Sequence, residues 1–324
     1  MRVALDEFPS CEIVNFDALT YAGNLENLEG IDDKRHRFVR GDICDRDAVL
    51  AALDAGTDAI VNFAAESHVD RSIHSAHEFI LTNVLGTQML LDAARARNVS
   101  RFVQISTDEV MGSLPEDERA FFTEDSPFQP NSPYAASKAA AEQFVRAAHH
   151  TFGLDTVITR CGNNYGPRQF PEKFLPLMLA NALNDEPIPV YGDGRNVRDW
   201  IYVDDHCRAI SSVLQRGRSG VTYNIGARNE RRNIDVAHSV LDAVSKPHSL
   251  IQFVEDRPGH DRRYAIDSKL IESELGWRPR ETWESGLNKM IAWYREHADW
   301  LARVRSGAYR EYYARQYGME VGAP

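Results

Sequence analysis

The sequence predicts an α/β fold built on a doubly wound parallel sheet, with a smaller, loop-rich part after it. Short apolar segments typical of buried strands alternate with helical patterns along the first half of the chain. Such alternation indicates a parallel sheet covered by helices on both faces. Beyond residue 165 prolines and glycines become denser. We therefore divide the chain into residues 1–165 and 166–324, and expect some segments of the second part to return to the first.

The expected strands follow one another at 12–17, 37–42, 59–65, 101–107 and 155–160. Helices separate them, and the clearest helical patterns cover 83–98 and 132–152, while residues 1–10 look like the end of an earlier helix. In doubly wound sheets ligands bind beyond the carboxyl ends of the strands. Polar or small residues stand at these ends, namely Asp17, Asp42, Ala64, Ala65 and Thr107. Their order predicts one sheet that binds one extended ligand.

Composition excludes several classes of protein. The 324 residues, 43% of them apolar, can bury one large core or two modest ones. The sequence has no run of 18 apolar residues, so we expect no membrane span, and residues 1–7 lack the apolar stretch of a signal peptide. A net charge of −11 argues against a nucleic-acid partner. Four scattered cysteines without a C-x-x-C pair fit a reduced, cytoplasmic protein without structural zinc.

Two short motifs carry the chemistry. Asp108 and Glu109 follow Thr107, and Tyr134 comes 25 residues after Glu109 with Lys138 four positions further on. A tyrosine and a lysine at this spacing share one helix face, so we expect the ammonium to lower the pKa of the phenol. An ionised phenol can take a proton from a sugar hydroxyl while hydride leaves the same carbon. That oxidation leaves the two carboxylates unused, which predicts a second, proton-moving step.

A plainer interpretation of both motifs also exists. Tyr-x-x-x-Lys is an ordinary spacing on an amphipathic helix, and Asp-Glu is common in solvated turns. The carboxylate pair follows a predicted buried strand that carries Thr107, and this position favours chemistry over a solvated turn.

Seven sequence blocks resemble one family. They are 17–24 (DALTYAGN), 64–72 (AAESHVDRS), 106–110 (STDEV), 131–138 (NSPYAASK), 160–167 (RCGNNYGP), 191–200 (YGDGRNVRDW) and 257–264 (RPGHDRRY). In this order they closely resemble the dTDP-glucose 4,6-dehydratases of the extended short-chain dehydrogenase/reductase superfamily. The resemblance begins near Glu12 and extends to 312–317 (YYARQY).

The resemblance implies a three-step reaction. Bound NAD would oxidise C4 of the glucose ring, with Tyr134 as base, Lys138 tuning it and Thr107 holding the C4 oxygen. Glu109 would then take the C5 proton and Asp108 would protonate the departing C6 hydroxyl. Hydride return to C6 would give the 4-keto-6-deoxy sugar, so the net reaction is that of a lyase. Opposite roles require the pKa values of the two carboxyls to be pushed apart, and their mutual repulsion would help.

The resemblance also assigns the binding residues. On the cofactor side Asp17 would bond the adenosine ribose and favour NAD over NADP, and the adenine and nicotinamide ends would be lined by Asp42, Ile43, Ala64, Ala65, Ser67, Tyr134 and Lys138. The substrate residues would be Glu66, Asn163, Lys173, Leu177, Pro189, Tyr191, Arg198, Arg257 and His260. An arginine fork suits the diphosphate, although a lone arginine is often only a solvated surface residue. We expect Arg262 to be solvated, and Trp277 and Trp283 to serve packing.

The sequence departs from the family pattern in two places. Family members have a strand and a G-x-x-G-x-x-G turn before the helix that leads to the strand ending at Asp17, and here no such pattern precedes Asp17. We expect a central strand of a 3-2-1-4-5-6 sheet to be missing, together with the turn and helix N-terminus that cradle a pyrophosphate. Backbone groups in the interior would then be unpaired. The second departure is Met111, where the family usually has tyrosine, and we expect it to alter packing near the pocket.

The first departure leaves two interpretations of the chain open. Either the start codon is assigned too late and the native protein is longer, or the chain is a truncated, catalytically silent relative that acts as a non-enzymatic partner. In both cases we expect weaker NAD binding than in the family. An epimerase or decarboxylase is a third interpretation, and it is weaker because these relatives lack the Asp-Glu pair. The resemblance further implies a homodimer, with the helices at 83–98 and 132–152 forming a four-helix interface.

Overall fold

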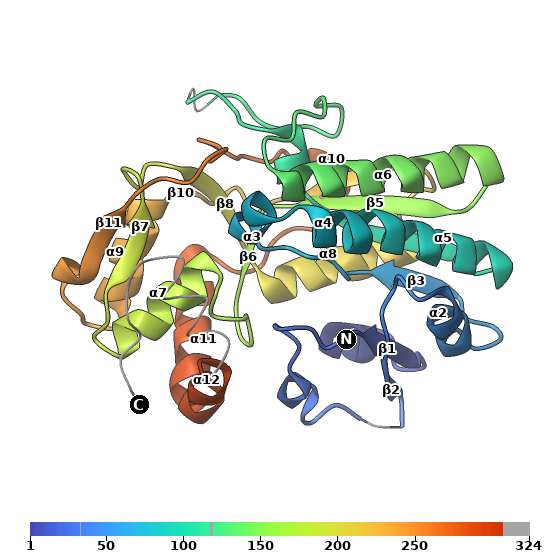
Figure 1. Ribbon diagram of the computed structural model, residues 1–324, viewed down its shortest axis with the longest axis horizontal. Coiled ribbons are helices and arrows are strands. Elements are labelled where there is room, and N and C mark those ends of the chain that lie inside the picture. The colour runs from blue at the N-terminus through green and yellow to red at the C-terminus, as the bar shows by residue number, and fades with distance from the viewer. Residues whose placement is uncertain (33, 117–118, 307–324) are drawn as a thin grey trace.

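The computed structural model describes residues 1–32, 34–116 and 119–306. The sequence block at 312–317 lies outside these residues. The first half of the chain alternates strands and helices as predicted (Figure 1). Its elements are α1 (Arg2–Glu7), β1 (Ile13–Asp17), η1 (Leu25–Leu28), β2 (His36–Arg40), α2 (Arg46–Ala52), β3 (Ala59–Asn62), α3 (Val69–His74), α4 (His77–Phe79), η2 (Ile80–Gly86), α5 (Thr87–Ala96), β4 (Arg101–Thr107), η3 (Asp108–Met111), α6 (Pro133–Phe152) and β5 (Thr156–Cys161).

The second half contains shorter strands and several helices. Its elements are β6 (Asn163–Tyr165), α7 (Phe174–Leu183), β7 (Ile188–Tyr191), β8 (Val197–Tyr202), α8 (Val203–Arg216), β9 (Thr222–Ile225), β10 (Glu230–Arg232), α9 (Asn233–Ala243), η4 (His248–Leu250), β11 (Ile251–Val254), α10 (Lys269–Leu275), α11 (Trp283–Glu296) and α12 (Ala298–Val304). Strand β9 pairs with β5 in parallel, so the chain returns to the first sheet after leaving it.

The main sheet has the strand order β3-β4-β5-β9, and its strands are parallel. Helix α6 contacts β4 and β5 on one face, while α8 contacts β5 on the other. Figure 1 shows α6 above the sheet and α8 below it. The doubly wound α/β fold predicted from the sequence is therefore confirmed.

The five predicted strands are present, and their ends have local causes. Strand β3 ends at Asn62, three residues before its predicted end. The Asn62 side chain accepts a hydrogen bond from the Ala64 amide at 3.1 Å, which turns the backbone out of the sheet. Strand β2 ends at Arg40, because the Asp42 carboxylate accepts from the Cys44 amide at 2.8 Å and starts a turn.

The parallel sheet is interrupted between β1 and β3. Strands β1 and β2 form a separate two-stranded sheet, and Figure 1 shows them set apart from β3. Strand β5, which has a partner on each side, is buried at every position. Strand β3 is apolar at three of four positions, yet those three are only half-buried. The gap stands where the sequence predicted a missing central strand.

Helix α6 forms because its ends are well defined in the sequence. The Ser132 hydroxyl accepts from the Ala135 amide at 3.1 Å, and Pro133 occupies the first turn, where no intrahelical donor is needed. Gly153 ends the helix with a left-handed backbone, φ 70°, which glycine adopts without strain. The helix therefore begins one residue before Tyr134 and fixes the position of that side chain.

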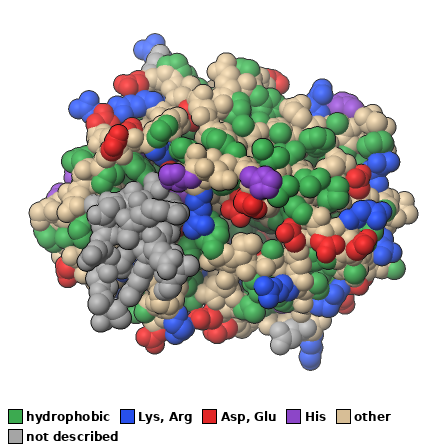
Figure 2. All heavy atoms as spheres, in the orientation of Figure 1, with side chains coloured by type: hydrophobic (Ala, Val, Ile, Leu, Met, Phe, Trp, Pro, Cys, Tyr) green, Lys and Arg blue, Asp and Glu red, His purple; other side chains and the backbone are tan. Residues whose placement is uncertain are grey.

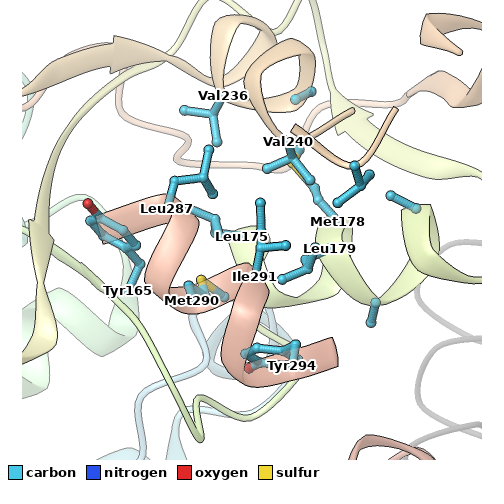
Figure 3. Close-up of a cluster of buried hydrophobic side chains, with 14 of the residues drawn as sticks. Tyr165, Leu175, Met178, Leu179, Val236, Val240, Leu287, Met290, Ile291 and Tyr294 are labelled. Carbon is cyan, nitrogen blue, oxygen red and sulfur yellow. The ribbon is translucent and has the colours of Figure 1, made fainter. Parts of the chain in front are cut away.

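The second half of the chain has its own hydrophobic core. Leu287, Met290 and Ile291 of α11 point toward Leu175 of α7 and Val240 of α9 (Figure 3). Trp277 and Trp283 are buried in the apolar clusters of the molecule, which confirms the packing role expected of them.

The last described helix ties the two halves of the molecule together. The Arg303 guanidinium of α12 pairs with Glu26 at 2.6 Å, and the Trp300 indole donates to the Asn27 side chain at 3.1 Å. These contacts join residues more than 270 positions apart. No described helix is long and apolar enough to cross a membrane. The four cysteines are free, and no described cluster of His, Cys, Asp and Glu could hold a metal.

His206 of α8 is expected to make the fold sensitive to acid. Burial lowers the pKa of this imidazole from 6.5 to about 4. The unfolded chain therefore takes up a proton between pH 6.5 and 4 that the folded chain refuses, and stability falls as pH falls through this window. The contribution is about 3 kcal/mol at most. Urea unfolding of His206→Leu should show a flatter pH profile than the parent, and the exposed His150→Leu should not.

Candidate active site

The carboxyl end of β4 carries Thr107, Asp108 and Glu109. Thr107 caps the short helix η3, its hydroxyl accepting from the Glu109 amide at 3.3 Å and donating to the Asp108 carboxylate at 3.2 Å. Asp108 is buried, and its second carboxyl oxygen has no hydrogen-bond partner among the described residues. Since an unpaired buried carboxylate is costly, this oxygen favours a proton or a ligand.

Both carboxyls are biased toward the protonated form, to different degrees. Burial first, and then repulsion from Glu109, raise the pKa of Asp108 well above its usual range. Burial also raises the pKa of Glu109, while Arg257 and Arg198 act in the opposite direction. Asp108 therefore has the larger tendency to hold a proton. This is the asymmetry expected of a pair in which one member donates and the other accepts.

Tyr134 and Lys138 lie in the first two turns of α6, beside these carboxyls. Lys138 is buried and its ammonium donates to the Ile105 carbonyl at 2.6 Å. Burial lowers the pKa of Lys138 from 10.5 to about 8. The pKa of Tyr134 is raised well above 10, by burial first and then by the charges of Glu109 and Asp108. The expectation that the lysine lowers the phenol's pKa is thus wrong for this structure, because burial and carboxylate repulsion dominate.

A buried ion pair joins β5 to α6 and also holds the carboxyl end of β4. The Arg160 guanidinium of β5 contacts Glu142 of α6 at 2.8 Å, and the Ser106 hydroxyl donates to the same carboxylate. Met111 is buried with Tyr264, and its sulfur accepts from Arg160 at 3.6 Å. This is the packing role of the position that departs from the family pattern.

Five of the predicted cofactor residues line one cavity of about 1610 Å³, namely Asp17, Asp42, Ile43, Ala64 and Ala65. Glu66, expected on the substrate side, also lines it. These residues lie at or just after the carboxyl ends of β1, β2 and β3, as predicted. The Asp17 carboxylate accepts from the Leu19 amide at 2.7 Å, which leaves its other oxygen available to a ribose hydroxyl. The arrangement fits the adenosine half of an extended dinucleotide.

The described lining of this cavity does not include Thr107, Asp108 or Tyr134. Ser67, expected at the nicotinamide end, is held from the other half of the molecule. The Lys173 ammonium donates to the Ser67 carbonyl at 2.6 Å and to its hydroxyl at 3.2 Å. Burial lowers the pKa of Lys173, while Glu172 and Glu109 act in the opposite direction. Lys173 thus joins the substrate side to the cofactor side.

The substrate residues supply positive charge opposite the carboxyls. Arg198 of β8 is buried, donates to the Asp261 carbonyl at 2.9 Å and lies 4.1 Å from the centroid of the Tyr264 ring. Arg257 is half-buried and lies 3.5 Å from Asp70. His260 contacts Asp256 at 2.6 Å, and burial beside Arg257 and Arg198 lowers its pKa to about 4. In the view of Figure 2, basic, acidic and histidine side chains lie near the middle of the molecule's visible face.

The other residues named from the sequence differ in how deeply they are buried and in their partners. Tyr191 is half-buried and its phenol donates to Asp70 at 3.0 Å, whereas Pro189 and Leu177 are buried. Asn163 begins β6 and is half-buried, where a ligand can reach it. Arg262 is not simply solvated as expected, because it pairs with Asp193 at 2.9 Å and Glu116 at 3.0 Å.

Two residues that the sequence did not single out, Asp70 and Asn83, hold other site residues in position by hydrogen bonds and an ion pair. Asp70 bridges Tyr191 and Arg257. Asn83 clamps the Glu66 backbone with two bonds of 2.9 Å and donates to Ser137 at 2.8 Å. Asp70 lies within the matched block at 64–72, and this position could have indicated that it belongs to the site. Nothing in the sequence marked Asn83 in the same way.

Comparison with known proteins gives consistent matches. The family model described as GDP-mannose 4,6 dehydratase matches residues 5–290. A dTDP-glucose 4,6-dehydratase of Xanthomonas campestris pv. campestris is 50% identical over 92% of this chain and 90% of its own length. One from Salmonella typhimurium is 46% identical over 94% and 91%.

Solved structures match as well. The crystal structure of a dTDP-glucose 4,6-dehydratase from Streptomyces venezuelae, with NAD bound, has a TM-score of 0.90 at 49% identity, over 94% of this chain and 93% of that one. A UDP-glucose 4-epimerase of Thermus thermophilus in complex with NAD has a TM-score of 0.83 at 30% identity, over 90% and 94%.

Proposed function

The chain belongs to the family of nucleotide-sugar 4,6-dehydratases, and from this premise we propose that it is a dTDP-glucose 4,6-dehydratase. It is an NAD-dependent lyase that converts dTDP-glucose to dTDP-4-keto-6-deoxyglucose. The observation that carries the proposal is the pair formed by the buried Asp108 and the half-buried Glu109 at the end of β4, beside Tyr134 of α6. An epimerase needs no acid for a C6 hydroxyl. The dehydratase match, at 49% identity, also exceeds the epimerase match at 30%.

NAD, when bound, supplies a hydride acceptor for C4 and a donor for C6. The residues that would hold it are Asp17, Asp42, Ile43, Ala64, Ala65 and Ser67, six of the positions expected from the sequence. Around the nicotinamide end, Tyr134 would accept the C4 hydroxyl proton and Thr107 would hold the C4 oxygen. Lys138, one turn further along α6, is anchored on the Ile105 carbonyl.

Elimination of water then depends on the two carboxyls. Glu109, whose pKa is raised by burial while Arg257 and Arg198 oppose that rise, would remove the C5 proton that the C4 ketone makes acidic. Asp108, held protonated by burial, would donate to the departing C6 hydroxyl. A neutral Asp108 also removes one of the charges that raise the pKa of Tyr134.

The substrate residues orient the nucleotide end. Arg198 and Arg257 would meet the diphosphate, with His260, Asn163 and Lys173 beside it, and the stretch Pro189 to Tyr191 would contact the base. Glu66 would contact the sugar, while Leu177 would pack behind the nucleotide segment. We assign residues 1–165 mainly to the cofactor, and residues 166–324 mainly to the sugar nucleotide.

Asp70→Asn is expected to weaken substrate binding more than catalysis. The carboxylate holds Tyr191 and Arg257 together, and loss of its charge loosens both groups. Hydrogen bonds to charged groups contribute about 1.5–3 kcal/mol, so KM should rise roughly tenfold while kcat changes little. Steady-state kinetics would show this, with Asp193→Asn, at the exposed Arg262 pair, as the matched control. An equal fall in kcat would contradict a positioning role.

Assembly and location complete the proposal. Apolar side chains are exposed on η2 and α6, namely Ile80, Leu85, Phe144 and Phe152. Helices α5 and α6 pack side by side, which supports a homodimer joined through a four-helix interface. We place the enzyme in the cytoplasm. Sedimentation at several concentrations tests the dimer, and a monomer throughout would refute it.

Product analysis tests the function. The purified chain is incubated with NAD and, separately, dTDP-glucose, UDP-glucose and GDP-mannose. The 4-keto-6-deoxy sugar should form from dTDP-glucose, whereas a 4-epimer would favour the epimerase, and no product would favour the silent relative. A parallel chain extended in frame upstream of Met1 tests the expected weak NAD binding, because only the extended chain should then bind NAD tightly.

A further inference from the structure

The loop that follows β1 sends one aromatic side chain into the second half of the molecule. Thr20 and Ala22 of this loop line the same cavity as Asp17. Tyr21 stands between them, and its phenol donates a hydrogen bond to the Glu172 carboxylate at 2.8 Å. The donor and the acceptor are 151 positions apart in the sequence. One wall of the cavity is therefore fastened to a segment of the substrate part.

The Tyr21 ring is enclosed by charged and aromatic groups. The Arg71 guanidinium lies 3.6 Å from the centroid of the ring, a distance typical of a cation–π contact. Phe170 meets the ring edge-on, with the two centroids 5.9 Å apart. Burial first, and then the charge of Glu172, raise the pKa of Tyr21, so the phenol keeps its proton and remains a donor. Glu172 is itself buried, and a hydrogen bond to a carboxylate is stronger than one between neutral groups.

The segment that carries Glu172 is held in place by its own half of the molecule. Helix α7 begins two residues later, and most of its side chains are buried in the core of the second half. On the other side of Glu172, the Gln169 carbonyl accepts a hydrogen bond from the Tyr294 phenol of α11 at 2.6 Å. Because the acceptor is fixed at both sides, its bond to Tyr21 restrains the loop at 18–24.

The next residue makes a second tie of the same kind. The Lys173 ammonium donates to the Ser67 carbonyl at 2.6 Å, in the segment that follows β3. Glu172 and Lys173 are adjacent, and each holds one of the two segments that carry predicted cofactor residues. The second half of the molecule thus restrains both sides of the cofactor site.

The proposed dehydratase reaction, on which this inference rests, requires such a restraint. It takes a hydride from C4 and returns it to C6, so the reduced cofactor must stay bound between the two transfers. We propose that Tyr21 is a positioning residue that latches the loop at 18–24 to Glu172 and thereby slows release of the reduced cofactor.

Dissociation of NADH from the 324-residue chain tests the proposal. Bound NADH is displaced by excess NAD in a stopped-flow instrument, and its fluorescence gives the rate. Tyr21→Phe removes only the hydroxyl, and loss of a hydrogen bond to a charged group should make NADH leave roughly tenfold faster. The dissociation constant for NADH, from the same fluorescence, should rise by the same factor. Unchanged dissociation from Tyr21→Phe would overturn the proposal.

Two further variants show whether the hydrogen bond itself is responsible. Tyr223→Phe is the matched control, because its phenol also donates to a glutamate, Glu274, at 2.8 Å, and should release NADH at the parent rate. Glu172→Gln keeps an acceptor oxygen, so its rate should lie between those of the parent and Tyr21→Phe. In the Tyr21→Phe background the same change should add little, since both act through one bond. Additive effects would contradict the proposal.

Hydrogen–deuterium exchange of the cofactor-free chain gives a second readout. The Leu19 and Gly23 amides are hydrogen-bonded within the loop, and both should exchange roughly tenfold faster in Tyr21→Phe. Amides of β4 and β5 should keep the parent rate. Parent-like exchange of the loop, or faster exchange of the whole chain, would overturn the latch. Neither readout uses dTDP-glucose or turnover, so an inactive chain can still show the latch, and its absence leaves the dehydratase proposal standing.

Discussion

Replacing Asp108 with Asn is expected to stop the reaction after the first oxidation. The amide keeps the shape of the side chain but cannot donate the carboxyl proton to the departing C6 hydroxyl. General acids contribute about 10²–10⁴-fold, so turnover should fall by that factor while C4 oxidation continues. Reduced nicotinamide should therefore accumulate with bound substrate in a stopped-flow absorbance trace.

Glu109→Gln is the matched control for this result. Both variants block elimination, but only Glu109→Gln should prevent removal of the C5 proton. In D₂O the Asp108→Asn enzyme should exchange the C5 proton of bound substrate, and the Glu109→Gln enzyme should not. Normal turnover by Asp108→Asn, or equal exchange by both variants, would show that the roles of the two carboxyls are assigned incorrectly.

Tyr134→Phe is expected to slow the first step itself. Without the phenol the C4 hydroxyl proton has no acceptor next to Thr107, and the rate of C4 oxidation should fall about 10²–10⁴-fold. Single-turnover measurements would show slow formation of reduced nicotinamide and no intermediate behind it. Tyr223→Phe, at the Glu274 contact of β9, should behave as the parent does. Fast reduction by Tyr134→Phe would remove Tyr134 from its assigned role.

Local patterns in the sequence predicted the fold well. The strand at 101–107 has the predicted bounds, because a short segment with Phe102, Val103 and Ile105 stands between helical patterns and leaves little freedom. Helix α6 begins one residue later than predicted, with Ser132 as its cap. The gap at β1 was predictable too, since a missing glycine pattern is a property of the sequence.

The electrostatics of the site could not be predicted in the same way. The spacing of Tyr134 and Lys138 says that they share a helix face, but it does not say how deeply that face is buried. Burial and the nearby carboxyls reverse the expected direction of the Tyr134 pKa shift. The contacts of Asp70 could not be predicted either. Its partners Tyr191 and Arg257 lie 121 or more residues away along the chain, so only the fold brings them together.

The tie between α12 and residues 26–27 bears on how the protein forms during synthesis. Strand β9 completes the main sheet only after residue 225 has left the ribosome, and Glu26 meets Arg303 later still. Domains generally fold as units during synthesis, yet here neither half holds all its own contacts. The contacts of Glu26 and Asn27 with α12 can therefore form only after residues 300–303 have been synthesised, near the end of translation.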